Sequence, residues 1–221
     1  MNLTNNKNII LVNKPKHWTS NDVVRKVKNI LKVKKIGHAG TLDPLATGLL
    51  ILGVNSGTKQ LNDLLTYKKS YIATIHFNYY TSTYDSEGEV LEYQKKEIQL
   101  SDIKKVLDIW MQVDYFQYPP KFSAIKINGK KAYELARQNV DFEIKPKLVK
   151  LLDYKIISFE HNELIIEIEV TKGFYVRSFA YDLGKKLDNF ACLAGLIRNK
   201  IGEFKLEEAY DIQDLYDYSF E

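Results

Sequence analysis

Apolar residues along this chain recur at two different spacings, one typical of helices and one typical of strands. The segment of residues 19–33 predicts a helix with one apolar and one basic face, and Ser20 stands where its N-cap would be. Residues 49–54 form an unbroken apolar run, as in a fully buried strand. Residues 69–80 alternate between apolar and polar, as a half-buried strand does. Both element types are therefore expected early in the chain.

The rest of the sequence predicts several hairpins and four further helices, of which the first is expected over residues 58–69. A helix is expected over residues 101–111, and another after the Asn-Gly turn at residues 128–129. Two long strands should flank a turn at residues 161–162, with a helix through Asp182 beyond them. This order favours an α+β fold with a mixed, largely antiparallel sheet flanked by helices. The length fits a single domain over residues 1–221.

The composition is that of a globular chain, with 45% hydrophobic and 27% charged residues. No apolar run approaches the roughly 18 residues that a membrane-spanning helix needs. The first ten residues also lack the features of a secretory signal, so we expect a cytoplasmic protein. The single cysteine, Cys192, allows no internal disulfide and no cysteine-based zinc site, and is expected to be a small buried apolar residue.

The charges are unevenly distributed, although the net charge is only +4. Residues 1–38 hold nine Lys and Arg against one acid, and residues 121–150 hold eight against three. Acidic residues gather instead around residues 85–97 and 206–221. A polyanion is the natural partner of such basic blocks, but the solvated surface of a lysine-rich protein explains them equally well.

The segment "GHAGTLDPLATG", residues 37–48, presents a carboxylate in an unusual setting. Asp43 lies between conformationally permissive glycines and a rigid Pro44, five residues after His38, and the buried strand follows almost at once. Such a carboxylate suits a nucleophile or base offered to a ligand, and a turn-capping aspartate is an equally good interpretation. The spacings of phosphate-binding loops, dinucleotide-binding loops and serine hydrolases are absent from the sequence.

Five segments together resemble the TruB family of tRNA pseudouridine synthases, over about residues 9–200. In chain order they are "NKPKHWTSNDVV", "GHAGTLDPLATGLLILGVNSGTK", "KSYIATI", "PPKFSAIKINGKKAYELAR" and "TKGFYVRSFAYDLG". The resemblance implies a pseudouridine synthase catalytic domain that isomerises uridine 55 in the T loop of tRNA. It implies no metal, ATP or organic cofactor, no protein partner and a monomeric enzyme that binds the T stem-loop.

The resemblance also assigns catalytic roles to three residues. Asp43 matches the aspartate that attacks the target nucleoside, at either uracil C6 or ribose C1′. Arg177 matches the arginine that pairs with this aspartate and keeps it ionised and oriented. Tyr71 matches the tyrosine that stacks on the base and takes the C5 proton. Because a phenol has an ordinary pKa near 10, this tyrosine needs help from its neighbours.

Four further residues match positions that contact the substrate. His38, Tyr175 and Leu196 correspond to residues around the flipped nucleotide, where contacts offset the few kcal/mol that extrusion of a base costs. Lys59 matches a lysine at the border of the catalytic pocket, and the basic helix should lie near phosphates.

The sequence departs from the family pattern at several positions. His17 stands where the family usually has glycine, so its turn either has negative φ or is strained. Phe122 replaces a tyrosine, and Leu196-Ile197-Arg198 replaces Leu-Arg-Arg, which puts one RNA-facing charge in doubt. The sequence ends before a C-terminal PUA-type RNA-binding domain. We therefore expect RNA contact to rest on the catalytic domain, including the insertion-like segment 121–150, with a more salt-sensitive grip on tRNA.

Two alternatives remain for the function. The same chemistry could act on another RNA, or the chain could be an RNA-binding module that refolds tRNA and catalyses only secondarily. The joint presence of Asp43, Tyr71 and Arg177 argues against a purely binding role, because phosphate binding requires none of these three in that arrangement.

Overall fold

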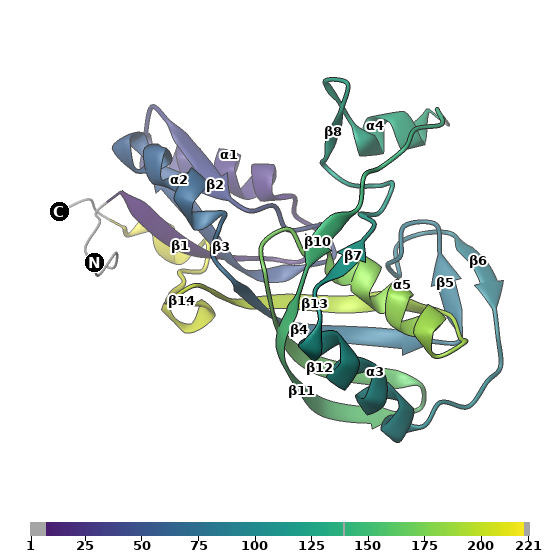
Figure 1. The fold of residues 1–221 in the computed structure, drawn as a ribbon. Coiled ribbons are helices and arrows are strands. Elements are labelled where there is room, and N and C mark those ends of the chain that lie inside the picture. The colour runs from purple at the N-terminus through teal and green to yellow at the C-terminus, as the bar shows by residue number, and fades with distance from the viewer. Residues whose placement is uncertain (1–7, 139, 219–221) are drawn as a thin grey trace. The chain divides into compact units, whose positions relative to one another are not determined.

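The computed structural model describes residues 8–138 and 140–218, and its contacts divide the chain into two compact units (Figure 1). Unit 1 comprises the residues up to Ile72 together with those from Leu196 onward, and unit 2 comprises Ala73–Gly195. Strands β4 (Lys69–Phe77) and β13 (Ala191–Ile201) have residues in both units.

Unit 1 contains a mixed sheet. Strand β3 (Thr47–Val54) pairs antiparallel with β1 (Ile9–Lys14) and with β2 (Ile36–Ala39). It pairs parallel with β13, where Arg198 lies opposite Gly48. In Figure 1, β1 and β3 run side by side. The other elements of unit 1 are α1 (Ser20–Leu31), the 3₁₀ helix η2 (Asn55–Gln60), α2 (Leu61–Leu64), β14 (Phe204–Lys205), and the 3₁₀ helices η3 (Leu206–Glu208) and η4 (Asp214–Tyr216).

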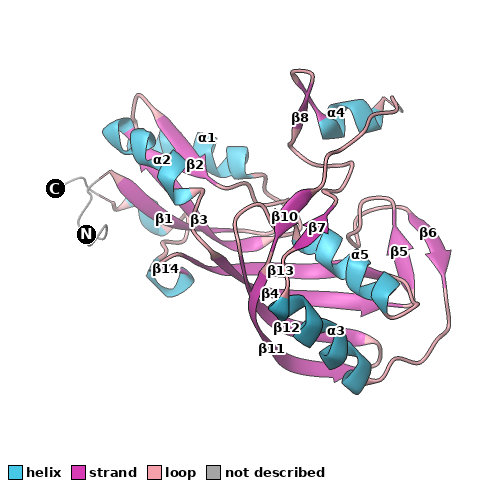
Figure 2. Cartoon of the chain, in the orientation of Figure 1, coloured by secondary structure: helices cyan, strands magenta, loops and turns pink. Residues whose placement is uncertain are grey.

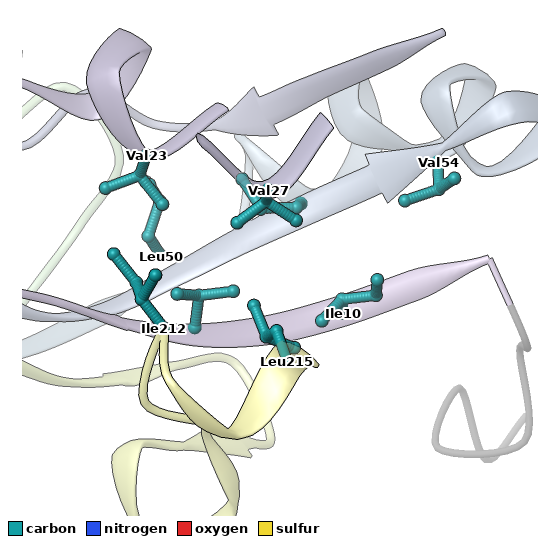
Figure 3. Close-up of a cluster of buried hydrophobic side chains, with 9 residues drawn as sticks. Ile10, Val23, Val27, Leu50, Val54, Ile212 and Leu215 are labelled. Atoms are coloured by element: carbon teal, nitrogen blue, oxygen red, sulfur yellow. The ribbon is translucent and has the colours of Figure 1, made fainter. Parts of the chain in front are cut away.

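A cluster of buried apolar side chains joins α1, β1, β3 and the segment around η4 (Figure 3). Its members are Ile10, Val12, Val23, Val27, Leu50, Leu52, Val54, Ile212 and Leu215. Burial of each such side chain stabilises the fold by about 1.5–3 kcal/mol. The cluster anchors β3 directly after the Asp43 loop, as the apolar run over residues 49–54 predicted.

Helix α1 (Ser20–Leu31) begins one residue earlier than its predicted cap implied. Its N-cap is Thr19, whose side chain accepts a hydrogen bond from the Asp22 backbone N–H, while the Asp22 carboxylate accepts from the Thr19 N–H at 2.8 Å. The prediction of Ser20 as the cap was therefore wrong. Ser20 is buried, and its hydroxyl contacts the backbone of Leu42 instead.

Unit 2 has the strand order β13–β4–β12–β11, and β11 pairs antiparallel with β12. Helices α3 (Leu100–Gln112) and α5 (Val176–Lys186) lie on the same side of these strands (Figure 2). The ring centroids of Trp110 on α3 and Phe179 on α5 are 5.5 Å apart. The remaining elements of unit 2 are β5 (Tyr79–Thr81), β6 (Val90–Tyr93), β7 (Tyr115–Gln117), β8 (Lys126–Ile127), β9 (Lys130–Lys131), α4 (Ala132–Arg137), β10 (Lys147–Val149), β11 (Leu151–Glu160) and β12 (Glu163–Val170).

The predicted turns have the backbone geometry that their residues allow. Asn128 and Gly129 both have positive φ, at 49° and 84°, as a two-residue hairpin turn requires. His161 and Asn162, between the two long strands, have φ of 50° and 62°. His17 has a φ of 66°, so of the two expectations for this glycine replacement the strained one holds.

These elements confirm the predicted α+β fold with a mixed sheet flanked by helices. No helix within residues 8–138 and 140–218 is long and apolar enough to cross a membrane. Cys192 is buried, as expected. The expectation about a secretory signal falls mainly on residues 1–7, which lie outside the described residues.

Candidate active site

The backbone of the Asp43 loop is held by hydrogen bonds on both sides of the aspartate. The Ser20 hydroxyl accepts from the Leu42 N–H at 2.9 Å and lies 3.2 Å from the Leu42 carbonyl oxygen, to which it donates. The Pro44 carbonyl accepts from the His17 N–H at 2.8 Å, and the Asp43 carbonyl accepts from the Ala46 N–H at 3.0 Å. Asp43 itself is half-buried. A partly accessible carboxylate on a fixed loop is suited to covalent chemistry.

A buried lysine supports the same loop. Lys14, at the end of β1, has no exposed surface. Its ammonium group donates to the carbonyl oxygens of Pro15 at 2.9 Å and Trp18 at 2.6 Å, and it lies 3.5 Å from that of Pro44. Charge-assisted bonds of this kind fix the turn that carries His17 against the residue after Asp43.

A buried arginine lies on the other side of the loop. The Arg198 guanidinium donates to the Gly40 carbonyl oxygen at 3.0 Å and to the Leu49 carbonyl oxygen at 2.8 Å. Burial lowers the pKa of Arg198, and the interaction with Tyr71 opposes that change. Tyr71 itself is only 7% exposed. The buried guanidinium therefore fixes the backbone on both sides of Asp43, at Gly40 and at Leu49.

The other predicted residues of unit 1 differ in exposure. His38, on β2, is half-buried, and burial followed by the charge of Arg198 lowers the pKa of its imidazole. It is therefore a neutral side chain at neutral pH. Leu196, on β13, is buried, whereas Lys59, on η2, is exposed.

In unit 2, Arg177 is the second residue of α5 and is 5% exposed. Its guanidinium donates to the carbonyl oxygens of Thr83 at 3.1 Å and Phe122 at 3.0 Å, and a third contact is an ion pair with Asp85 at 3.6 Å. Phe122, the position where the family has tyrosine, thus contributes its backbone to Arg177.

Sequence reasoning missed Asp85. This carboxylate is 6% exposed, and it accepts from the Thr83 hydroxyl at 2.6 Å and from the Glu87 N–H at 3.2 Å. We had interpreted the acids of residues 85–97 as a negative surface. The signal was a short polar turn rich in Thr, Ser and Gly directly after a strand, a pattern typical of an aspartate that organises its own loop.

Tyr175 is oriented by a buried amide. Its N–H donates to the Gln117 side-chain oxygen at 2.7 Å, and its carbonyl accepts from the Gln117 side-chain nitrogen at 3.1 Å. Gln117 is 1% exposed and was not predicted. The Lys147 ammonium group lies 5.4 Å from the centre of the Tyr175 ring, so this aromatic ring already carries a cation on one side.

The predicted site residues therefore fall into two groups. Unit 1 holds His38, Asp43, Lys59, Tyr71 and Leu196, and unit 2 holds Tyr175 and Arg177. Within unit 1, Arg198 donates to the backbone on both sides of Asp43. The pairing of Asp43 with Arg177 joins residues of different units and stays a prediction.

Solved structures share this fold. The chain aligns with one in the structure titled "Crystal Structure of a Cbf5-Nop10-Gar1 Complex" with a TM-score of 0.75 and 26% identity, over 96% of the present chain and 54% of the other. A second match, "Structure of H/ACA RNP bound to a substrate RNA containing 2'-deoxyuridine", has a TM-score of 0.72 and 24% identity, over 96% and 53%. The chain thus spans about half the length of these structural relatives.

Sequence comparisons define the family. The family model described as "TruB family pseudouridylate synthase (N terminal domain)" matches residues 28–176. Proteins named tRNA pseudouridine synthase B are 53% identical in Ureaplasma urealyticum serovar 10, over 97% of this chain and 95% of that protein, and 46% identical in Malacoplasma penetrans, over 92% and 89%. The relative of the same name in Aquifex aeolicus is 41% identical, over 93% and 72%. This chain belongs to the TruB family.

Proposed function

We propose that this chain converts uridine 55 in the T loop of tRNA to pseudouridine, with Asp43 as the covalent catalyst. The observation that carries the proposal is a half-buried aspartate on a loop whose backbone is hydrogen-bonded on both sides, in a chain of the TruB family. The shared name of its relatives, tRNA pseudouridine synthase B, supports tRNA as the substrate.

The reaction rearranges one bond and moves one proton. Asp43 attacks the nucleoside at uracil C6 or ribose C1′, and the bond between N1 and C1′ breaks. The base rotates, and C5 forms the new bond to C1′. The bond from Asp43 to C1′ or C6 breaks, and its electron pair returns to the carboxylate, which regenerates the aspartate. The C5–H electron pair then restores the C5–C6 double bond, the C5 proton passes to Tyr71, and N1 ends protonated. The atoms of substrate and product are the same, so the reaction consumes no second substrate.

Arg177 pairs with Asp43 in this proposal. A guanidinium orients a carboxylate through two donors and favours its ionised form. The contacts of Arg177 with Asp85 and with the carbonyl oxygens of Thr83 and Phe122 support this role, because they fix the direction of the guanidinium.

The remaining predicted residues bind the RNA. His38, Tyr175 and Leu196 surround the flipped nucleotide, and a neutral imidazole suits contact with an uncharged base. Lys59 and the basic face of α1 contact phosphates, and the segment 121–150 adds further basic contacts. We further propose that residues 1–221 form one catalytic domain that works as a monomer in the cytoplasm, without a protein partner.

Mapping of pseudouridine in cells with and without this gene tests the substrate. Loss confined to position 55 of tRNA is expected, and loss at rRNA positions or in several tRNA loops would show that the RNA assignment is wrong. A tRNA transcript with cytidine at position 55 is the matched control in vitro, because it keeps the T loop but offers no uridine to isomerise.

A further inference from the structure

A groove in unit 1 follows one face of α1. Its volume is about 470 Å³, within the range of pockets that hold small ligands. Four of its lining residues recur at the spacing of one helix face, and two come from the turn before the helix. Together they are His17, Trp18, Asp22, Arg25, Lys26 and Asn29. A ligand in this groove would therefore lie along two turns of the helix.

The groove begins next to the loop of the predicted nucleophile. His17 lines the groove, and the backbone N–H of His17 donates to the Pro44 carbonyl oxygen at 2.8 Å. The same turn is fixed from β1, because the Lys14 ammonium group donates to the Trp18 carbonyl oxygen at 2.6 Å. An RNA strand that delivers a uridine to Asp43 therefore carries its neighbouring nucleotides close to this groove.

The backbone of His17 is strained. Its φ of 66° lies in the left-handed region, which glycine adopts freely and residues with a side chain do not. The hydrogen bond to Pro44 uses only the backbone of His17, so glycine would keep it. The His17 side chain is exposed and lines the groove. Because strain of this kind persists where it serves a function, the imidazole indicates a ligand in the groove.

The chemistry of the groove fits a nucleotide. Arg25 and Lys26 supply two cations, and Asp22 supplies one carboxylate. That carboxylate already accepts hydrogen bonds from the Thr19 N–H and from Arg25, which orients the guanidinium. Trp18 is half-buried, because it packs against the apolar cluster of unit 1 and also lines the groove. An aromatic ring beside cations suits a base and its phosphate, since every base has a face that stacks.

We infer that this groove binds an unpaired T-loop nucleotide close to the target uridine. Its base stacks on the rings of His17 and Trp18. Its phosphate binds the cations of Arg25 and Lys26. The inference rests on the proposed function, because the uridine at Asp43 defines where the neighbouring nucleotide lies. His17 is then a substrate-binding residue at a position where the family usually has glycine.

Two substitutions of His17 separate the imidazole from the backbone strain. His17→Ala and His17→Gly both remove the ring, but only glycine relieves the strain, so His17→Gly should unfold about 2–4 °C above His17→Ala. Both variants should bind tRNA about 5- to 10-fold more weakly than the unsubstituted protein, the lower end of the effect of a lost stacking contact. Undiminished affinity in both variants, or full affinity in His17→Gly alone, would overturn the inference.

The phosphate contact is tested by the salt dependence of tRNA affinity. The Lys26 ammonium group lies 5.4 Å from the centre of the Tyr216 ring, which holds it beside the groove. Lys26→Gln should reduce the slope of log affinity against log salt by about one. Lys105→Gln is the control, because it removes one lysine charge from α3, outside the groove. Equal slopes for the two variants would contradict the phosphate contact.

A cycle between protein and RNA identifies the nucleotide. Each unpaired nucleotide of a T stem-loop RNA, except the target, is made abasic in turn, and affinity is measured for the unsubstituted protein and for His17→Ala. At one position the missing base should weaken binding to the unsubstituted protein and have much less effect on His17→Ala, because base and ring form one contact. Independent effects at every position would overturn the inference.

These affinities require no catalysis, so the two proposals fail separately. Coupling between the base and His17 in a protein that forms no pseudouridine at position 55 would refute the proposed function and support the groove. Pseudouridine formation at position 55 without any such coupling would refute the groove and leave the proposed function intact.

Discussion

The ion pair between Asp85 and Arg177 makes a quantitative prediction about the Asp85→Asn variant. The substitution preserves the shape of the side chain and an acceptor oxygen for the Thr83 hydroxyl and the Glu87 N–H. It removes only the negative charge, 3.6 Å from a guanidinium, in a pair whose side chains are 6% and 9% exposed. The variant therefore tests the charge of Asp85 almost in isolation.

The expected cost follows from this geometry. Removal of one partner from a buried ion pair costs about 3–5 kcal/mol, because the remaining charge stays buried. Since the carbonyl oxygens of Thr83 and Phe122 still accept from Arg177, we expect the lower end, about 3 kcal/mol. For a chain of this length that loss lowers the melting temperature by about 6–12 °C. If Arg177 orients the Asp43 carboxylate, the rate of pseudouridine formation should also fall, by about 10- to 100-fold.

The assays are thermal unfolding by circular dichroism and single-turnover kinetics on tRNA. A matched control is Asp102→Asn, which removes a carboxylate from an ion pair with Lys105 that is shorter, at 2.9 Å, but whose side chains are 73% and 49% exposed. Its cost should be at most about 1 kcal/mol. If Asp85→Asn unfolds within about 2 °C of the unsubstituted protein, a loss of at most about 1 kcal/mol, the reasoning from burial is refuted.

Three further predictions concern stability. Burial raises the pKa of Asp182 to about 6, so the folded protein keeps a proton on this carboxyl that the unfolded chain loses near pH 4. The Asp182→Asn variant should therefore be more stable than the unsubstituted protein by about 1–2 kcal/mol at pH 7.5 and by almost nothing at pH 4. Equal shifts of the melting temperature at both pH values would contradict this prediction. The effect of Lys69 on the pH dependence of stability has the opposite sign. The folded protein loses the proton of this amine near pH 8, whereas the unfolded chain keeps it to about pH 10.5, so stability should rise from pH 8 to pH 10. Denaturant titrations of the Lys69→Met variant should lack that rise. The Gly48→Ala variant should lose about 3 kcal/mol or more of stability, because the added Cβ would come within 2.5 Å of a backbone oxygen. The Gly129→Ala variant has open space around the new Cβ and should lose about 1 kcal/mol, from its φ of 84° alone. Similar losses of stability in the two variants would refute the steric argument.

The predictable part of the fold is the part that local patterns encode. The period of apolar residues located α1 and β3, and the Asn-Gly pair located the turn at residues 128–129, because these features depend on neighbouring residues. The error at the start of α1 was avoidable. Thr19 is followed by an acid at the third position, and this capping-box spacing favours Thr19 over Ser20.

The site was only partly predictable because its supporting residues act at long range. Tyr71 and Arg177 came from the resemblance to the family and from no local pattern. The local pattern around Asp43 singled it out but allowed either a nucleophile or a turn cap, and the resemblance decided between the two. The importance of Asp85 depends on a partner 92 residues away in the chain, and a carboxylate in a polar turn has no sequence feature that names that partner. Arg198 looked like part of a run of RNA-facing charges, yet it is buried against backbone carbonyls.

The most direct test of the account is the rate of pseudouridine formation at position 55 by the Asp43→Asn variant, measured in single turnover alongside its affinity for tRNA. The substitution keeps the size of the side chain and removes the nucleophilic carboxylate. We predict no detectable pseudouridine, with tRNA affinity and melting temperature close to those of the unsubstituted protein. Pseudouridine formation by this variant at an undiminished rate would show that Asp43 is not the covalent catalyst.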